Sequence, residues 1–230
     1  MASPNAVAPP TGLRDPGART RIKICGVSRP EDVDAAMGAG ADAIGLVFFA
    51  KSPRHVKLER AAELTRRLAP FVTPVGLFVN AAREEIEAAI EAIPNLLLQF
   101  HGDEPADLCA SFGRPYLRAA RMAKGFDLID FARQHSRAQA LLLDAEVEGF
   151  GGGGKVFDWS LIPSDVPRPV VLSGGLHAGN VIQGIQTVRP WAVDVSSGVE
   201  SARGVKDAGA IRRFCEAVRE ADARRASAEA

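Results

Sequence analysis

RIKICGVSRPEDVDAAMGAGADAIGLVF, residues 21–48, decides the fold of this chain. The stretch begins with a short run rich in β-branched residues, continues through a charged segment of helical character, and ends in a second apolar run. The same order recurs in GGLHAGNVIQGIQTVRPWAVDVSSGV, residues 174–199. In both places a glycine marks the end of a strand, a helix follows, and the chain enters another strand. This is the pattern of a βαβ unit with parallel strands.

Similar units cover most of the chain. Eight apolar runs predict strands over 21–27, 43–49, 73–80, 95–102, 115–122, 138–145, 169–176 and 192–199. Helical periodicity connects several of them, as in 57–69 and 82–93, and we expect a last helix over about 207–222 with Asp207 as its N-cap. An open doubly wound sheet usually has five or six strands, whereas eight strands with eight connections are typical of a closed (β/α)8 barrel. We therefore predict an α/β fold, a single-domain TIM barrel.

The barrel is expected to occupy residues 21–222. Residues 1–20 hold four of the fifteen prolines and only two large aliphatic residues, Val7 and Leu13, so we expect a flexible N-terminal arm. Residues 223–230 are interpreted as a C-terminal tail. A glycine-rich loop, 146–157, is expected to replace much of the connection after the sixth strand, because so many glycines disfavour a helix.

Composition excludes several classes of protein. In 230 residues, 47% hydrophobic content argues against disorder, and 28 basic against 28 acidic residues give no net charge. Such a neutral chain has no overall field to attract nucleic acid or a membrane surface, and no apolar run reaches the 18 residues of a membrane span. The chain starts without the features of a signal peptide, and its three cysteines are far apart. We expect a cytoplasmic protein whose partner is a small molecule.

Strand alternation places several polar side chains inside the barrel. Because Ile22 and Ile24 must pack outward on helices, Lys23 and Cys25 point inward. The same reasoning turns inward the following residues of other strands: Gln99, His101, Leu142, Asp144, Asp194 and Ser196. Among these, Cys25, His101, Asp144 and Asp194 lie near the C-terminal ends of their strands, where barrel enzymes place their chemistry. A lone inward polar residue is usually a satisfied core residue, but four at one rim predict an active site.

Lys23 lies deeper than the others and needs a partner, since an unpaired buried ammonium is very costly. The eighth strand closes the barrel against the first, so Asp194 is the nearest candidate. We predict a Lys23–Asp194 ion pair beside Cys25, with the charged atoms within about 6 Å of each other.

Two glycine turns at the ends of neighbouring strands predict a phosphate site. They consist of Ser173, Gly174 and Gly175, followed by a helix from near Ala178, and of Ser196, Ser197 and Gly198. Glycines let backbone N–H groups approach an anion, and the loops after the seventh and eighth strands are common phosphate sites in barrels. The alternative is that these glycines only make tight turns. The partner is therefore expected to be a phosphorylated small molecule.

The run Gly149–Lys155 has the spacing of a nucleotide-binding P-loop. That motif requires a Ser or Thr next and a helix at once, but Val156 follows and VFDWS is not helical. A loop that folds over the substrate, with Gly154 and Lys155 reaching the phosphate, fits better. A plain flexible linker is the remaining alternative.

A set of motifs then resembles one family over residues 21–222. The motifs are Lys23-Ile24-Cys25-Gly26, FFAKSPRHV (48–56), PVGLFVN (74–80), LQFHGDE (98–104), LLLDA (141–145), GGGGKVFDW (151–159), LSGGL (172–176) and VDVSSGVE (193–200). In this order they resemble phosphoribosylanthranilate isomerase of tryptophan biosynthesis. One departure, LQFHG in place of the more usual LQLHG, falls on an outward-facing position and affects no expected role.

The resemblance implies an Amadori rearrangement of N-(5-phospho-β-D-ribosyl)anthranilate, without cofactor or metal. It implies that Cys25 is the general base, that Asp144 is the general acid, and that Arg54 is associated with the anthranilate end of the substrate. His101 either orients the substrate or holds a loop. For the acid to stay protonated the pKa of Asp144 must be raised, and for the base to act as thiolate that of Cys25 must be lowered. We hypothesise that Lys23 supplies the positive potential.

Three alternatives remain at this point. A related aminoaldose-phosphate isomerase of histidine biosynthesis would carry a carboxylate in place of Cys25. A dual-specificity enzyme would act on both aminoaldoses. A catalytically inactive phosphate-binding scaffold is disfavoured, because Cys25 and Asp144 are both present. The sequence leaves open whether the chain is a monomer or a homodimer.

Overall fold

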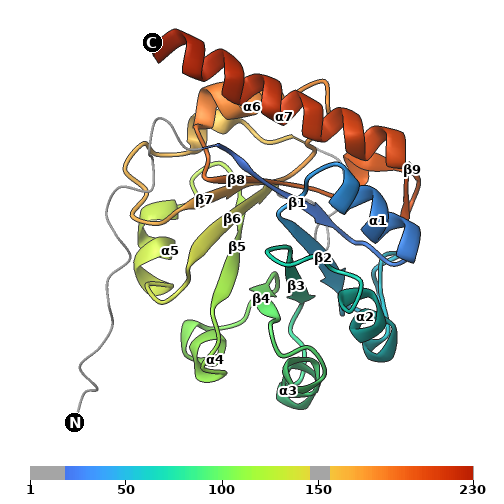
Figure 1. Cartoon of the computed structure of the whole chain (residues 1–230). Helices are drawn as coiled ribbons and strands as arrows, with labels where there is room; N and C mark the ends of the chain where they lie inside the picture. The colour runs from blue at the N-terminus through green and yellow to red at the C-terminus, as the bar shows by residue number, and fades with distance from the viewer. Residues whose placement is uncertain (1–18, 146–155, 230) are drawn as a thin grey trace.

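The structure is a computed structural model and describes residues 19–145 and 156–229. Within them, eight parallel strands form a closed barrel in chain order, and the eighth strand pairs with the first (Figure 1). The strands are β1 (Arg21–Cys25), β2 (Ala43–Val47), β3 (Thr73–Phe78), β4 (Leu97–Phe100), β5 (Tyr116–Met122), β6 (Ala140–Ala145), β7 (Val170–Leu172) and β8 (Ala192–Val195). The predicted barrel is confirmed, and each strand lies inside the run that predicted it.

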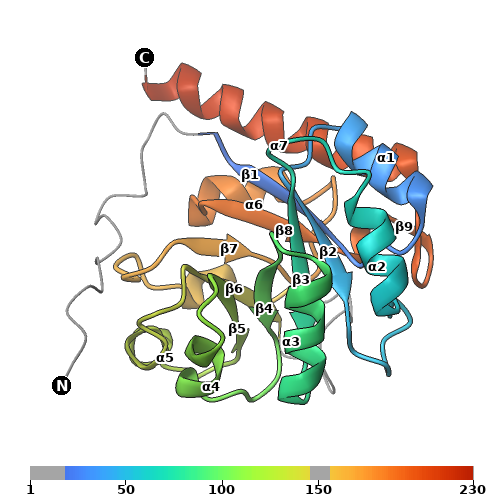
Figure 2. The ribbon, with the colours of Figure 1, turned by 60° about the horizontal axis from the view of Figure 1, so that its bottom comes forward.

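Helices surround the strands, as two directions of view show (Figures 1 and 2). They are α1 (Pro30–Gly38), α2 (Leu58–Thr65), α3 (Arg83–Ala92), α4 (Ala106–Ser111), α5 (Leu128–Gln134), α6 (Val181–Val188) and α7 (Ala208–Glu229). Two short 3-10 turns, η1 (Trp159–Leu161) and η2 (Ser197–Val199), and a hairpin of β9 (Glu200–Ala202) and β10 (Val205–Lys206) complete the described elements. In the described part of the β6–β7 connection, the one helical element is η1.

The two faces of the strands pack into different cores. Outward residues such as Ile24, Leu98 and Val193 are fully buried against the helices. Inward residues fill the barrel with a smaller cluster: Val75, Leu117, Ala119, Ala140, Leu142, Val171 and Ala192. The assignment of inner and outer faces from strand alternation is therefore confirmed for these strands.

The last helix differs from its predicted extent. Asp207 caps it as expected, because its side chain accepts a hydrogen bond from the backbone N–H of Ala210 at 2.6 Å. The helix then continues beyond residue 222 to Glu229, through the segment expected to be a tail. Residues 223–229 are mostly Ala, Arg and Glu, which have high helix propensity. In Figure 1, α7 runs alongside α6 and α1, with which it makes contacts.

The start of the barrel is tied to this helix. Thr20 donates from its backbone N–H and its hydroxyl to the carboxylate of Asp222, each at 2.7 Å. Arg19 donates to Asp42 at 2.8 Å. These two residues, assigned to the arm from the sequence, thus contact the folded body, and Thr20 is buried.

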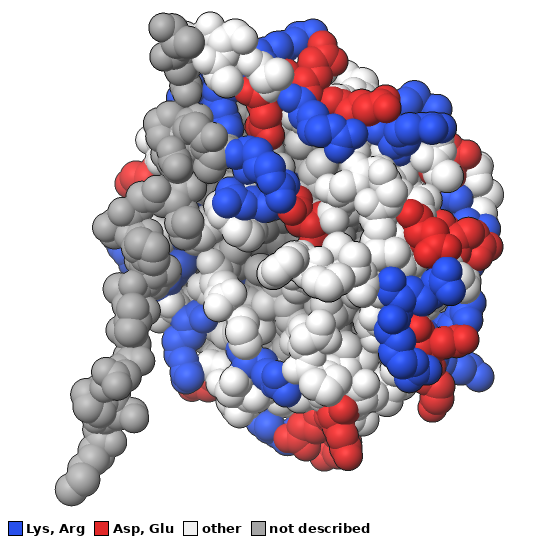
Figure 3. Space-filling model, viewed as in Figure 1, with Lys and Arg blue, Asp and Glu red and all other residues white. Residues whose placement is uncertain are grey.

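The surface agrees with the neutral composition. On the face drawn in Figure 3, Lys and Arg side chains lie interspersed with Asp and Glu rather than gathered by sign. Among the described residues, every helix is too short or too polar to cross a lipid bilayer.

Candidate active site

The thiol of Cys25 occupies a space that the neighbouring strand leaves open. Cys25 is the last residue of β1, is 5% exposed, and lies in register with Gly45 of β2. A methyl group at Gly45 would lie 2.7 Å from the sulfur and 3.1 Å from the ammonium of Lys23. Glycine at position 45 is therefore what admits both side chains.

Lys23 and Asp194 form the predicted ion pair. The distance between Lys23 Nζ and Asp194 Oδ1 is 2.7 Å, and both side chains are buried. Burial opposes the charged ammonium, but the Asp194 carboxylate and the Cys25 thiol outweigh it, so the pKa of Lys23 rises above its ordinary value. The second oxygen of Asp194 accepts from the hydroxyl of Ser173 at 3.0 Å, which links β1, β8 and β7.

Asp144, near the end of β6, is held by His101, the residue that follows β4. Its Oδ2 lies 3.1 Å from Nε2 of His101, and its Oδ1 accepts from the backbone N–H of Ala145 at 2.9 Å. The other ring nitrogen of His101 lies 3.1 Å from Nε2 of Gln99. If the Gln99 amide donates there, His101 presents its Nε2–H to the carboxylate. His101 thus contacts Asp144 directly, an arrangement that the sequence analysis did not foresee.

The two glycine turns lie against the rest of the rim. Gly174 has φ +79°, and a methyl group there would lie 3.0 Å from Asp144 Oδ1 and 2.6 Å from the backbone N of Ala145. A methyl group at Gly198 would lie 1.9 Å from the carbonyl oxygen of Leu176, so the two turns are in contact. Helix α6 begins at Val181 instead of near Ala178, because residues 178–180 form a turn in which Asn180 Oδ1 accepts from His177 N at 2.8 Å.

Arg54, in the loop after β2, is 7% exposed and packs across Gly26. Gly26 has φ +77°, and a methyl group there would lie 2.5 Å from Cδ of Arg54. The guanidinium donates to both oxygens of Glu200, from Nε at 2.7 Å and from Nη2 at 2.9 Å. Within the described residues its Nη1 makes no hydrogen bond, so one edge of the guanidinium is available to a ligand.

Two charged residues that sequence reasoning missed complete this side of the site. The buried ammonium of Lys206 donates to Glu200 at 2.7 Å and to the carbonyl oxygen of Ser196 at 3.0 Å. Glu200 is the last residue of the motif VDVSSGVE, but its contacts with Arg54 and Lys206 were not predicted from the sequence. No sequence motif marks Lys206, because the β9–β10 hairpin is what brings it to the site. Gly154 and Lys155 lie outside the described residues, and Ser197 begins η2.

The acid–base character of Cys25 departs from the sequence hypothesis. Burial is the largest effect and raises the pKa of the thiol above its ordinary value. Lys23 and Lys206 lower it and Asp194 raises it, without reversing the effect of burial. The expectation of a lowered thiol pKa is therefore wrong, although the predicted influence of Lys23 has the expected sign.

The side chains at the rim can exchange protons and bind anions. Among the described residues, no group of three or more His, Cys, Asp or Glu side chains is arranged to hold a metal ion. A thiol and a carboxyl group lie at the same end of the barrel, with buried cations and backbone turns around them.

A model of one family matches residues 22–217, and its description is N-(5'-phosphoribosyl)anthranilate (PRA) isomerase. The chain belongs to this family. The N-(5'-phosphoribosyl)anthranilate isomerase of Leptothrix cholodnii is 73% identical over 207 residues, covering 90% of this chain and 94% of the relative. That of Methylibium petroleiphilum is 71% identical, covering 92% and 99%. The chain is thus an enzyme, an isomerase of tryptophan biosynthesis.

Solved structures agree. The phosphoribosyl anthranilate isomerase of Thermotoga maritima is 40% identical, with a TM-score of 0.79 over 87% of this chain and 99% of that one. Another solved phosphoribosyl anthranilate isomerase, 38% identical with a TM-score of 0.76, covers 87% and 99% and is a complex with reduced 1-(o-carboxyphenylamino)-1-deoxyribulose 5-phosphate.

Proposed function

We propose that this chain converts N-(5-phospho-β-D-ribosyl)anthranilate into 1-(2-carboxyphenylamino)-1-deoxyribulose 5-phosphate, with Asp144 as general acid and Cys25 as general base. The observation that carries the proposal is that a buried thiol and a buried carboxyl group lie at the same end of a barrel of this family, near the C-terminal ends of β1 and β6. The complex of a related isomerase with a reduced form of the product supports the substrate class.

The reaction is an internal transfer of hydrogen. Asp144 protonates the furanose ring oxygen, the C1–O bond breaks, and the nitrogen lone pair forms a protonated Schiff base. That cation acidifies the proton on C2, so that Cys25, as general base, removes it to give an enolamine. The enolamine gains a proton at C1 and loses its O–H proton, which yields the ketone. No electrons leave or enter the molecule.

The surroundings of Asp144 hold its carboxyl group in place. His101 lies on one oxygen of Asp144 and the Ala145 N–H on the other, so the carboxyl group has a fixed orientation. Gly174 brings the turn after β7 to within contact of the same group. A substrate whose phosphate lies at that turn would therefore have its sugar ring next to the acid.

The two anionic ends of the substrate are assigned to different groups. We assign the phosphate to the turns of Ser173, Gly174, Gly175, Ser196, Ser197 and Gly198. Gly154 and Lys155, which the sequence also assigns to the phosphate, lie outside the described residues. We assign the aryl carboxylate to Arg54, whose Nη1 has no partner among the described residues while Glu200 holds its other edge. A guanidinium binds carboxylates well because its donors lie in one plane.

The test is complementation and turnover. Purified chain should convert phosphoribosylanthranilate, and its gene should restore growth of an auxotroph lacking this isomerase. Cys25→Ala and Asp144→Asn should each lower kcat on the order of a thousandfold or more, whereas Cys215→Ala, in the helix core, should retain it. Full activity of either site variant would contradict the assignment. Turnover of the histidine-pathway aminoaldose instead would favour that alternative.

A further inference from the structure

Glu200 is a buried carboxylate that serves three donors at once. Its side chain is 4% exposed and accepts from Arg54 at 2.7 and 2.9 Å, from Lys206 at 2.7 Å, and from the backbone N–H of Gly204 at 3.1 Å. Burial opposes its charge, but Arg54 and Lys206 hold the pKa of Glu200 below its ordinary value. One buried carboxylate is therefore shared by two cations, which leaves the three side chains with one net positive charge.

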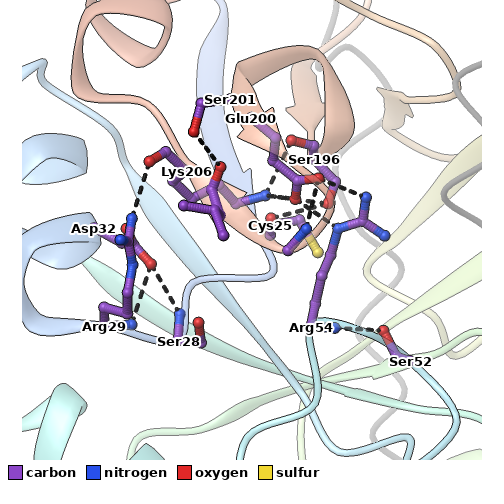
Figure 4. A network of polar contacts seen from close by, with 12 residues as sticks. Cys25, Ser28, Arg29, Asp32, Ser52, Arg54, Ser196, Glu200, Ser201 and Lys206 are labelled. Carbon is purple, nitrogen blue, oxygen red and sulfur yellow. Dashed lines mark hydrogen bonds and ion pairs between the residues drawn. The ribbon is translucent and has the colours of Figure 1, made fainter.

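Lys206 continues the contacts toward β1. Besides Glu200, its ammonium donates to the carbonyl oxygen of Ser196 at 3.0 Å and to the hydroxyl oxygen of Ser196 at 3.3 Å. The hydroxyl of Ser196 donates in turn to the carbonyl oxygen of Cys25 at 3.1 Å. Figure 4 shows the resulting series of contacts, which passes from Arg54 through Glu200, Lys206 and Ser196 to Cys25.

The backbone next to these contacts is closely packed at two glycines, Gly204 and Gly26. Gly204, at the tip of the β9–β10 hairpin, has φ +81°, and a methyl group there would lie 2.6 Å from the carbonyl oxygen of Pro53. Gly26 lies directly under Arg54, as described above. The hairpin is thus fitted between the loop that carries Arg54 and the strand end that carries Cys25.

We propose that Glu200 and Lys206 are positioning residues of the reaction: through Ser196 they hold the carboxylate-binding arginine and the thiol base in one fixed arrangement, and Lys206 supplies part of the positive field at the thiol. The proposal rests on the proposed function and extends it to the β9–β10 hairpin. Neither residue is assigned a contact with the reacting atoms.

The charged groups that face Cys25 come from three strands. Lys23 belongs to its own strand, Asp194 to β8 and Lys206 to β10, and their fields act on the thiol with the signs expected of two cations and one anion. Lys23 and Asp194 neutralise each other at 2.7 Å. Lys206 shares Glu200 with Arg54, so this second group of charges carries one net positive charge near the thiol.

Alkylation of the thiol tests the field without any turnover. Iodoacetamide modification of Cys25, followed by mass spectrometry across pH, gives the midpoint of its titration, while Cys109 and Cys215 are fully buried. Lys206→Met should raise this midpoint by roughly half a unit to one unit. Lys206→Arg keeps the charge and should leave it near the parent value, as should Lys57→Met, an exposed control. A Lys206→Met profile that superposes on the parent would overturn the electrostatic part.

Steady-state kinetics test the positioning part. Glu200→Gln should raise KM for phosphoribosylanthranilate by about tenfold, because Arg54 loses its charged anchor, while inhibition by inorganic phosphate stays unchanged. The double variant Glu200→Gln/Lys206→Met removes one charge of each sign. If the single variant unfolds, KM is measured on this double variant instead. An unchanged KM in a folded variant would contradict the proposal. Undiminished turnover by Cys25→Ala would instead refute the proposed function. The alkylation midpoints would still test the effect of Lys206 on the thiol, because they do not depend on turnover.

Discussion

At the scale of single residues, β2 leaves the space that the sulfur of Cys25 occupies. Gly45 lies in register with Cys25, and its missing side chain leaves room for the thiol and the ammonium of Lys23. Gly45→Ala would place a methyl group 2.7 Å from the sulfur, closer than van der Waals contact allows. We expect kcat to fall by on the order of tenfold to a hundredfold, with a loss of about 1–3 kcal/mol in unfolding free energy.

Steady-state kinetics and urea unfolding of the purified variant give both quantities. Gly38→Ala is the matched control, because a methyl group at Gly38 meets nothing within 4 Å. If Gly45→Ala were as active as Gly38→Ala, the position that Gly45 gives to the thiol would not be needed for activity, and this prediction would be wrong.

The residue contacts that the sequence predicted are those that follow from strand geometry alone. The Lys23–Asp194 pair was predictable because alternation turns both side chains inward and barrel closure makes their strands neighbours. The contacts of Lys206 were not predictable, since they depend on a hairpin turning back after β8. The Glu200 partner of Arg54 was missed for the same reason, and strand period says nothing about either.

At the scale of secondary-structure elements, hydrogen bonds join the start of β1 to the C-terminal half of α7. Asp222 accepts two hydrogen bonds from Thr20, the residue before β1. Asp222→Ala would leave the buried hydroxyl of Thr20 and its N–H without this acceptor, so we expect a loss of about 1–3 kcal/mol. Chemical unfolding measures it, and Glu216→Ala, exposed on the same helix, should change stability far less. Equal effects of the two variants would refute this role of Asp222.

Element types were predictable and element ends were less so. The strands follow from runs of apolar residues, and α7 follows from its buried Ile211, Phe214 and Val218. Its extension beyond residue 222 has no apolar period and depends on helix propensity together with the Asp222 contact. The start of α6 shifts to Val181 because the Asn180 side chain stabilises a local turn in the preceding residues, which competes with the helix.

At the scale of the whole molecule, closure of the barrel assembles the site. Cys25 and Asp144 are far apart in the chain and belong to β1 and β6, yet Lys23, Asp194 and Ser173 connect their strands through β8 and β7. The turn after Ser173 then reaches Asp144. The site therefore exists only once the eighth strand has paired with the first, and any partly closed barrel should lack activity.

A buried histidine makes the stability of this closed barrel depend on pH. Burial, with the nearby Arg118 guanidinium, lowers the pKa of His135 from its ordinary 6.5 to about 4. Because the native pKa is the lower one, the stability that neutral His135 contributes is complete above about pH 6.5. This contribution is lost as pH falls toward 4, because His135 takes up a proton in the unfolded chain but stays neutral in the native state. Between pH 6.5 and 5 this amounts to about 1.5 kcal/mol.

Urea unfolding at a series of pH values measures the effect. His135→Gln retains a side-chain acceptor for Arg118, whose Nε donates to His135 Nε2 at 3.4 Å, but cannot titrate. Its stability should therefore decline less steeply than that of the parent between pH 6.5 and 5, whereas His55→Gln, at an exposed position, should follow the parent. Parallel curves for the parent and His135→Gln would mean that the histidine is protonated in the native barrel. The acid sensitivity would then have to come from carboxylates such as Glu200. The pKa of Glu200 is lowered, so its contribution to stability is lost only at more acidic pH.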